Sequence, residues 1–422
     1  MTAPTGARQR HGREREAVCG PAPVVGLQPG APAPPGQLSS VRALYLHVPF
    51  CERKCSYCDF VSMAPTGDER RYVDALRREI RTLARALPGV ELDTVFIGGG
   101  TPGLLEPELL AAVLAEVRGG FALAADAEVT LEANPSSTSE RRAACWLEAG
   151  CTRVSLGIQS LEPDVLAFLD RVHDAERAVT AVAEVRRAGF RSVNCDLIYA
   201  VPGLDDARWR ATLDRVLELD VGHLSAYELT VEPGTPLHVA VRRGRVRPVD
   251  PEAALRQHWI AVERAAVAGF AQYEVSNFAR PGQECRHNLV YWRNQYYAAA
   301  GLGAHGHLPA VAAAALGMEA AADAVAVRYW HGRSLPRYLA AAAAALLPMS
   351  GHESVLAADS ESERLLLGLR LQEGVSVPPA AAARALALEE AGLLRTKGHN
   401  ARLTRRGQEV LNAVALELVG SL

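Results

Sequence analysis

Short apolar segments alternate with longer amphipathic segments between residues 41 and 280. The short segments are rich in β-branched and aromatic residues, which is typical of strands. The longer ones, such as residues 68–87, repeat apolar residues at helical spacing over a charged face. This alternation predicts an α/β fold, a parallel sheet with crossover helices in a complete or partial (β/α) barrel. The predicted strands are 43–50, 93–99, 128–133, 153–158, 192–199, 223–229 and 271–278.

The alternation weakens after the predicted barrel, residues 41–280. Residues 281–347 are rich in alanine over much of their length, and we predict that they connect the barrel to a second domain. Residues 348–422 show the order helix, helix, basic hairpin, helix, which predicts a small winged-helix-like domain. Winged helices raise DNA binding as an alternative, but exposed basic hairpins are usually only solvated, so we favour a packing domain. The basic residues of this hairpin are Arg395, Lys397 and Arg402.

The first 40 residues mix Arg, Pro, Gly and Ala with hardly any large apolar residue, and we predict a disordered tail over residues 1–40. They lack the uninterrupted apolar stretch of a secretory signal. The longest apolar run, around Leu339 to Leu347, is too short and too Ala-rich to span a bilayer. We therefore expect a cytoplasmic protein with no stable membrane insertion.

The charges nearly cancel, since 45 Lys and Arg residues face 48 Asp and Glu residues for a formal net charge of -3. This balance argues against a protein that is held to nucleic acid by bulk charge, so no nucleic acid partner is expected. The chain also has eight cysteines. Because cytoplasmic thiols are kept reduced, closely spaced cysteines in that compartment indicate a metal centre rather than disulfides.

Cys51, Cys55 and Cys58 lie at i, i+4 and i+7 in a polar loop directly after the first predicted strand. Three thiolates on one loop can hold a [4Fe-4S] cluster and leave its fourth iron open to an outside ligand. A structural zinc site is the alternative, but it calls for a fourth ligand and usually a second closely spaced cysteine pair. The later cysteines do not supply such a pair, and we interpret them as core residues: Cys145, Cys151, Cys195 and Cys285.

The segment YLHVPFCERKCSYCDF, residues 45–60, resembles the signature of radical S-adenosylmethionine enzymes, in the branch related to oxygen-independent coproporphyrinogen III oxidase. The resemblance runs from about residue 43 to the C-terminus. It implies a partial barrel of the radical SAM type, an open iron that binds S-adenosylmethionine, and an electron donor protein as partner. In this family the reduced cluster cleaves that cofactor to a 5'-deoxyadenosyl radical.

The loop GGGTPG, residues 98–103, follows the second predicted strand and also fits the G-x-G-x-x-G pattern of dinucleotide-binding proteins. That fingerprint needs a helix opening at the glycines, whereas Pro102 lies inside this loop. Glycines do leave bare backbone that a ligand can approach closely. The resemblance implies that the loop meets the methionine amino group of S-adenosylmethionine, through Gly100 and Thr101.

Further residues at the predicted strand ends are implied by the same resemblance to bind S-adenosylmethionine. Glu132 and Asp196 can accept hydrogen bonds from an amine or from ribose hydroxyls, and Arg171 can pair with a carboxylate. Each has a structural alternative, because Asp and Arg at barrel ends often pair with one another. The residues of this group are Tyr45, Tyr57, Glu132, Gln159, Arg171 and Asp196.

Two features indicate a chaperone rather than an oxidase. The oxidases have a fourth cysteine two residues after the third, and here that position is Phe60. The segment CRHNLVYW, residues 285–292, resembles the HNxxYW motif of the HemW-type heme chaperones, which hand heme to apoproteins such as respiratory enzymes. The resemblance therefore implies a heme chaperone with a [4Fe-4S] cluster, S-adenosylmethionine and heme. Coproporphyrinogen III oxidase is the alternative, and no catalytic residue is assigned.

The sequence does not decide which residue ligates the heme iron. His287 can donate an imidazole nitrogen to iron, while Tyr291 and Trp292 offer flat faces to a porphyrin. A histidine beside aromatic rings is more often a structural residue. His305 and His307 in GAHGH are alternative ligands.

Overall fold

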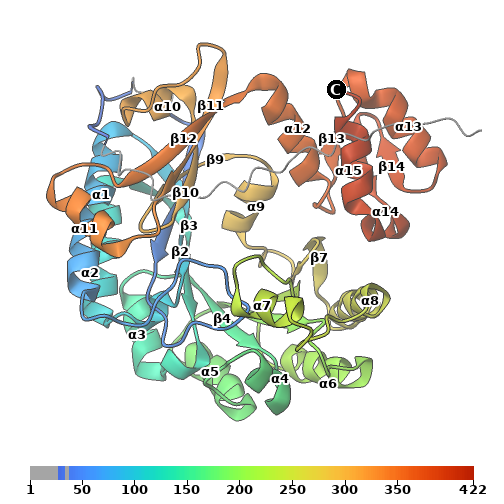
Figure 1. Ribbon diagram of the computed structural model, residues 1–422. Coiled ribbons are helices and arrows are strands. Elements are labelled where there is room, and N and C mark those ends of the chain that lie inside the picture. The colour runs from blue at the N-terminus through green and yellow to red at the C-terminus, as the bar shows by residue number, and fades with distance from the viewer. Residues whose placement is uncertain (1–26, 34–37) are drawn as a thin grey trace, which may run out of the picture.

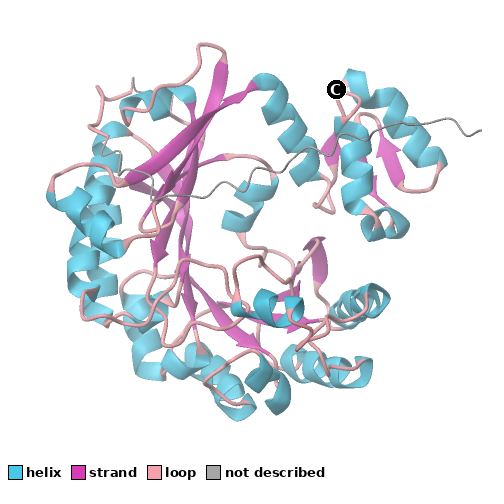
Figure 2. Ribbon diagram, in the orientation of Figure 1, coloured by secondary structure: helices cyan, strands magenta, loops and turns pink. Residues whose placement is uncertain are grey.

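The computed structural model describes residues 27–33 and 38–422. Its centre is a curved sheet of twelve strands in the order β12-β11-β10-β9-β1-β2-β3-β4-β5-β6-β8-β7 (Figures 1 and 2). Six consecutive strands run parallel and confirm the predicted partial barrel. They are β1 (Val41–Val48), β2 (Glu91–Gly99), β3 (Ala122–Ala133), β4 (Arg153–Gln159), β5 (Ser192–Tyr199) and β6 (His223–Glu228).

Helices on the outer face of the sheet connect these strands (Figure 1). In α1 the residues Tyr72, Leu76, Ile80 and Leu83 recur at three- and four-residue spacing and are all buried. Because such residues form one stripe along a helix, they hold α1 against the sheet. The helices are α1 (Glu69–Ala86), α2 (Pro107–Gly120), α3 (Glu140–Glu148), α4 (Pro163–Phe168), α5 (Ala175–Arg187) and α6 (Asp206–Leu217), with 3-10 turns at Pro102–Leu104 and Pro135–Ser137.

The seventh predicted strand, 271–278, is wrong in detail, because the structure has a hairpin there. After α7 (Pro236–Arg242) and α8 (Pro251–Val267), the strands β7 (Ala271–Glu274) and β8 (Asn277–Ala279) pair antiparallel, and β8 pairs antiparallel with β6. The Glu274 carboxylate accepts hydrogen bonds from the backbone N–H of Ser276 and from the Asn277 side chain. These bonds hold the turn that splits the segment, and the barrel stays open at this edge.

Residues 281–347 contribute more than a connection, since they extend the sheet on its other side. Strand β9 (Tyr296–Ala300) pairs parallel with β1, and the next three strands pair antiparallel. The last of them lies inside the segment predicted to begin the C-terminal domain at residue 348. The added elements are α9 (Arg286–Trp292), β10 (His305–Pro309), α10 (Ala310–Ala315), β11 (Ala324–His331), α11 (Leu335–Ala343) and β12 (Met349–Leu356).

The predicted small C-terminal domain is present, and it begins after β12. It has its own buried core around Leu365, Leu394 and Leu418 and lies to one side of the barrel (Figure 1). Its three strands form an antiparallel sheet in the order β13-β15-β14. Its elements are α12 (Ala357–Gly368), β13 (Val375–Ser376), a 3-10 turn (Pro379–Ala381), α13 (Ala382–Glu390), β14 (Leu394–Lys397), β15 (Asn400–Leu403), α14 (Arg405–Glu409) and α15 (Leu411–Val419).

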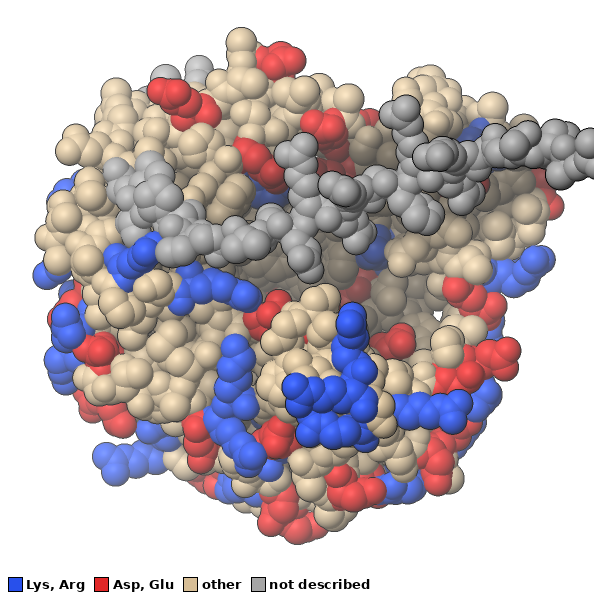
Figure 3. Space-filling model, viewed as in Figure 1, with Lys and Arg blue, Asp and Glu red and all other residues tan. Residues whose placement is uncertain are grey.

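Most of the predicted disordered tail, residues 1–40, lies outside the described residues. Where it is described, the chain packs on the barrel instead: Leu27 forms a β-bridge with Leu347, and Ala33 and Leu38 are buried. The surface shown in Figure 3 mixes Lys and Arg with Asp and Glu, as expected from the small net charge. Among the described residues, none of the helices combines the length and the apolar character that a membrane crossing requires.

Candidate functional site

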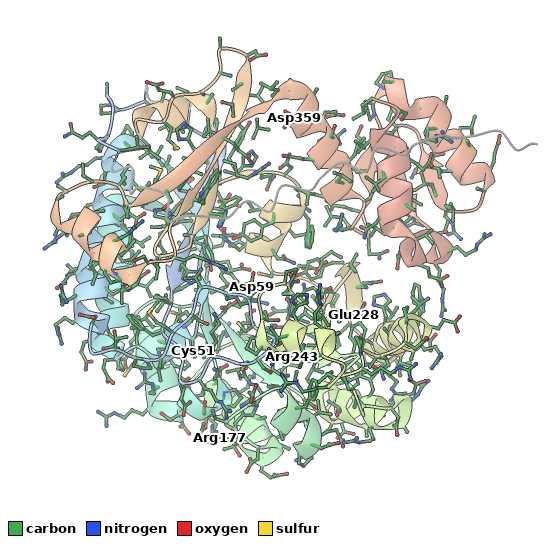
Figure 4. All side chains as sticks on the ribbon, in the orientation of Figure 1. Cys51, Asp59, Arg177, Glu228, Arg243 and Asp359 are labelled. Carbon is green, nitrogen blue, oxygen red and sulfur yellow. The ribbon has the colours of Figure 1, made fainter. Side chains whose placement is uncertain are left out.

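A cavity of about 930 Å³ opens at the carboxyl ends of the parallel strands. The three cysteines of the loop after β1 line it, and so do all the residues that the sequence predicted to bind S-adenosylmethionine. The strand ends converge because neighbouring parallel strands all finish at one edge of the sheet. Figure 4 labels Cys51, Asp59 and Glu228 among its lining residues. The predicted residues brought together here are Tyr45, Tyr57, Gly100, Thr101, Glu132, Gln159, Arg171 and Asp196.

The cysteine loop is tied to the barrel by hydrogen bonds at its centre. Asp170 accepts a hydrogen bond from the backbone N–H of Ser56 at 3.0 Å and pairs with Arg53 at 3.1 Å. Cys51 Sγ lies 3.2 Å from Thr101 Oγ1, and Cys58 is half-buried, so that burial raises the pKa of its thiol. The three thiols are thus held at the wall of one cavity by a fixed loop.

The three thiols line one cavity, which suits a cluster that takes one thiolate for each of three irons. Among the described residues, no group of three or more His, Cys, Asp or Glu side chains is placed to hold one metal ion. Zinc requires its ligands to converge, with each sulfur about 2.3 Å from the metal. In a [4Fe-4S] cluster each thiolate binds a different iron, so the sulfurs stand apart. Three cysteines on the wall of one cavity can supply the three thiolates of this second arrangement.

The glycine loop after β2 packs directly against the cysteine loop. Thr101 donates its backbone N–H to the Phe50 carbonyl at 2.7 Å, and a Cβ on Gly100 would lie 2.6 Å from that oxygen. Gly99 has a φ of +112°, and a Cβ there would lie 2.5 Å from the His47 ring. The chain then enters a 3-10 turn rather than an α-helix. The glycines therefore serve the contact between the two loops, which disfavours the dinucleotide alternative.

Two carboxylates meet in the inner part of the cavity. Glu132 accepts a hydrogen bond from the Gly99 backbone N–H at 3.0 Å. Asp196 accepts hydrogen bonds from Ser155 at 2.9 Å and from Asn194 at 2.8 Å. Burial raises the pKa of Glu132 to about 7, and the nearby carboxylate of Asp196 adds to this rise. The pair therefore favours a ligand that brings N–H or O–H donors.

A hydrogen-bonded chain connects two of the cysteines across the cavity wall. Arg171 lies 3.7 Å from Cys55 Sγ and donates to the Asn134 side chain at 2.6 Å. Asn134 in turn donates to Thr101 Oγ1 at 2.9 Å, and Thr101 contacts Cys51. Asn134 was not predicted from the sequence, although it follows the predicted residue Glu132 by two positions. The chain places a cation and a hydroxyl beside sulfurs that become anionic on binding iron.

Gln159 ends β4 with a φ of 68°, one of five described non-glycine residues with positive φ. A non-glycine residue whose backbone lies in the left-handed region is strained. Such strain persists where the surrounding structure imposes it, often at ligand sites. Gln159 lines the cavity beside Gly157 and Arg171. The bend therefore presents this predicted residue to the cavity.

The exposed rim of the cavity differs from its polar inner wall. Phe60 is 67% exposed and Tyr227 is 42% exposed, so two large aromatic side chains stand at the rim. His305 is also exposed, and its ring stacks on Trp330 with ring centres 6.4 Å apart. Arg333 lies beside them and donates to the Asp59 carbonyl at 2.9 Å. We call Phe60, Tyr227, His305, Trp330 and Arg333 the rim residues, all of which line the cavity.

His287 does not line this cavity but lies behind its wall, next to the lining residue Tyr291, and is completely buried. Its Nδ1 lies 2.8 Å from Thr94 Oγ1, and its Nε2 lies 2.9 Å from the Tyr291 hydroxyl. Burial lowers the pKa of His287 to about 3. Both ring nitrogens are therefore used inside the protein, and His287 offers no ligand to a metal in this conformation. His307, the other alternative, is buried as well.

Comparison with known proteins places this site in a family. The Radical SAM superfamily matches residues 45–216. Heme chaperone HemW of Mycobacterium tuberculosis (strain H37Rv) is 42% identical over 399 residues, covering 93% of this chain and 97% of that protein. The protein of that name from Bacillus subtilis is 30% identical, covering 90% of this chain and all of its own length. In fold, the chain is similar to coproporphyrinogen III oxidase (HemN) from Escherichia coli, with a TM-score of 0.74 at 20% identity over 91% of each chain.

Proposed function

The chain belongs to the HemW heme chaperones within the radical SAM superfamily, and from this we propose that it binds heme and delivers it to apo-hemoproteins in the cytoplasm. Recipients of the proposed kind are respiratory enzymes. One observation carries the proposal: a single cavity joins a polar inner wall with three cysteines to an exposed aromatic rim. The inner wall suits the cluster and S-adenosylmethionine, and the rim suits a porphyrin.

In the proposed arrangement Cys51, Cys55 and Cys58 would hold the [4Fe-4S] cluster, whose open iron supplies a coordination position for the amino and carboxylate groups of S-adenosylmethionine. The protein's own contribution is to orient that cofactor. Glu132 would accept a hydrogen bond from its amino group, and Arg171 would pair with its carboxylate. Asp196 would accept hydrogen bonds from the ribose hydroxyls.

The role of Glu132 predicts that binding of S-adenosylmethionine strengthens with pH. The raised pKa of about 7 leaves most of the carboxyl protonated at pH 6 and most of it ionised at pH 8. Only the ionised form accepts hydrogen bonds at both oxygens, so we expect affinity to rise about tenfold over this range. Calorimetric titration of the cluster-loaded protein measures the change. The variant Glu132→Gln should bind S-adenosylmethionine more weakly, and its affinity should change less with pH. An equal change of affinity with pH in wild type and variant would contradict the role of Glu132.

We propose that heme binds at the rim with His305 as its iron ligand. No hydrogen bond or ion pair of the His305 side chain is present among the described residues. Burial lowers the pKa of His305, and the positive charges of Arg333 and Arg328 lower it further. The imidazole is therefore neutral at physiological pH, which is the form that ligates iron. His287, by contrast, would first have to leave Thr94 and Tyr291.

The other rim residues complete a porphyrin site in this proposal. Phe60 and Trp330 offer flat apolar surfaces, and covering the exposed Phe60 ring would contribute on the order of 1.5 to 3 kcal/mol. Arg333 offers a guanidinium to a propionate carboxylate. Phe60 thus has a role that cysteine at its position could not fill. This gives a physical reason for the departure from the oxidase pattern.

Hemin titration of histidine variants tests the ligand. Wild-type protein should shift the Soret band, and His305→Ala should weaken hemin binding at least about tenfold, because the iron loses its protein ligand. His287→Ala should keep the band position of the wild type while lowering thermal stability, since Thr94 and Tyr291 lose a buried partner. His399→Ala, on the exposed C-terminal hairpin, is the matched control. If folded His287→Ala lost the Soret shift and His305→Ala kept it, His287 rather than His305 would be the heme ligand.

Coproporphyrinogen III oxidase is the second candidate, and the fold similarity to such an enzyme is the observation that keeps it in view. The oxidase function is disfavoured by Phe60, because the oxidases have a cysteine at this position. Under anaerobic conditions with S-adenosylmethionine and a reductant, the chaperone proposal predicts hemin binding and no conversion of coproporphyrinogen III. Formation of protoporphyrinogen IX at the rate of an active oxidase control, without a Soret shift on adding hemin, would favour the oxidase.

A further inference from the structure

Four arginines crowd the end of α7 and the turn that follows it. Arg242, Arg243, Arg245 and Arg247 lie within six residues and are all exposed. Among the described residues none of the four side chains has a hydrogen bond or ion pair. Other arginines of the barrel do pair, as Arg208 does with Glu162 and Asp164. We call these four residues the α7 arginine patch, and a group of blue side chains lies over α7 in Figure 3.

The α7 helix lies against the loop that carries the cysteines. Leu237 donates its backbone N–H to the Ser56 carbonyl at 3.0 Å, and its side chain is buried. The segment that leads from β6 to α7 also lines the cavity, at Leu229, Thr230 and Glu232. Arg243, labelled in Figure 4, is the residue that directly follows α7. The patch therefore lies at one end of a seven-residue helix whose other end contacts the cysteine loop.

The cysteine loop beside α7 is balanced in charge, unlike the α7 arginine patch. Exposed Glu52 and Asp59 balance the exposed Arg53 and Lys54 on that loop, and Arg53 also pairs with Asp170, so the unpaired positive charge here comes from the four arginines after Val241. Val239, on the exposed side of α7, is 39% exposed and supplies an apolar contact. Unpaired like charges at close spacing repel one another, so the patch becomes more favourable when an acidic partner covers it. A net charge of -3 for the whole chain makes this local excess distinctive.

We propose that the α7 arginine patch is the docking surface for an acidic electron-transfer protein that reduces the cluster. This rests on the proposed function, because it requires a cluster at Cys51, Cys55 and Cys58. One electron leaves a flavin or iron–sulfur centre of the donor, which is oxidised, and reduces the cluster by one electron. Electron-transfer contacts are small and short-lived, so a few unpaired charges can steer them. Docking beside the cysteine loop keeps the path between the two centres short.

An anionic membrane or a nucleic acid would also attract arginines. The contact between α7 and the cysteine loop favours a redox partner instead, because electron transfer requires the donor to dock near the cluster. The patch is also small, with four arginines on one short helix and turn. The C-terminal hairpin carries comparable exposed charges at Arg395, Lys397 and Arg402, away from the loop. That hairpin provides a matched control.

Stopped-flow reduction of the full-length, cluster-loaded protein by a reduced acidic flavodoxin tests the proposal. At low ionic strength flavodoxin should reduce the cluster of the double variant Arg243→Glu/Arg245→Glu at least about tenfold more slowly than that of wild type. High salt screens the charges, so the difference between the two reduction rates should become smaller. The hairpin variant Arg395→Glu/Arg402→Glu should match wild type. Excess dithionite should reduce the same amount of cluster in all three proteins, which shows that each carries it.

Equal rates with flavodoxin in the α7 variant and wild type would overturn the proposal. So would an α7 variant that loses binding to anionic phospholipid vesicles while its rate with flavodoxin stays unchanged, since the patch would then serve a membrane. Failure of the proposed function looks different. In that case wild type itself would show no cluster that dithionite can reduce.

Discussion

Cys55→Ser is expected to leave the purified protein without its iron–sulfur cluster. Cys55 is buried beside Arg171, whose guanidinium lies 3.7 Å from its sulfur. Two remaining cysteines cannot hold the cube, because each of three irons needs its own thiolate. Iron and acid-labile sulfide should fall from about four of each per chain to nearly none after anaerobic reconstitution. Chemical analysis and the visible absorption spectrum measure this directly.

Cys145→Ser is the matched control for that experiment. Cys145 lies on α3, is half-buried and takes no part in lining the cavity. It should keep the full iron content of the wild type. A Cys55→Ser protein with as much iron and sulfide as the control would mean that the cluster is held elsewhere.

Glu79→Ala is expected to cause a large loss of stability, on the order of 3 to 5 kcal/mol, because it leaves buried partners uncompensated. The Glu79 carboxylate is buried on α1, where it lies 2.5 Å from His331 Nε2. It also accepts hydrogen bonds from the Gly301 backbone N–H at 3.1 Å and from the Tyr338 hydroxyl at 2.6 Å. These contacts join α1 to the added strands, so urea denaturation should show an earlier midpoint.

The loss in free energy of unfolding caused by Glu79→Ala should also depend on pH. Burial lowers the pKa of His331, but the Glu79 carboxylate outweighs this, and the net pKa lies above its usual value of 6.5. A raised pKa means that the ion pair stabilises the fold fully below the unfolded value, and that this stabilisation is lost as pH rises through the folded value. The difference in unfolding free energy between wild type and variant should therefore be larger at pH 6 than at pH 9.

Two variants on the same helix separate the charge from the packing. Glu79→Gln keeps acceptors for Gly301 and Tyr338 and should cost less than Glu79→Ala. Asp74→Ala removes an exposed carboxylate, which lies 3.7 Å from Arg77, and should cost less than about 1 kcal/mol. Equal losses for Glu79→Ala and Asp74→Ala would show that the buried pair does not stabilise the fold.

The inner wall of the cavity could be predicted from sequence because its signals are local. The cysteines are spaced within one loop, and the other residues sit at the ends of segments with a strong strand pattern. Parallel strands bring those ends together whatever the lengths of the helices between them. Asn134 was missed because its bonds to Thr101 and Arg171 are made across the sheet.

The strands beyond residue 290 and the place of His287 could not be predicted for a related reason. Ala298, Ala299 and Ala300 are buried in β9, but alanine gives no strand pattern, so the segment resembled a linker. His287 contacts Thr94, which is 193 positions away in the chain. A motif of histidine and aromatic residues does not say whether the ring faces a cavity or the core. The structure settles the point by using both of its nitrogens.

The most direct test of the proposed function follows heme from this protein to a recipient. The chain, carrying its cluster, S-adenosylmethionine and one bound heme, is mixed anaerobically with the apo-form of a heme-dependent respiratory enzyme. Absorbance then follows the heme while an assay follows the activity of the recipient. The proposal predicts that activity appears as heme leaves the chain, and faster than with free hemin at the same concentration. Heme that stays on the chain while the recipient stays inactive would contradict it.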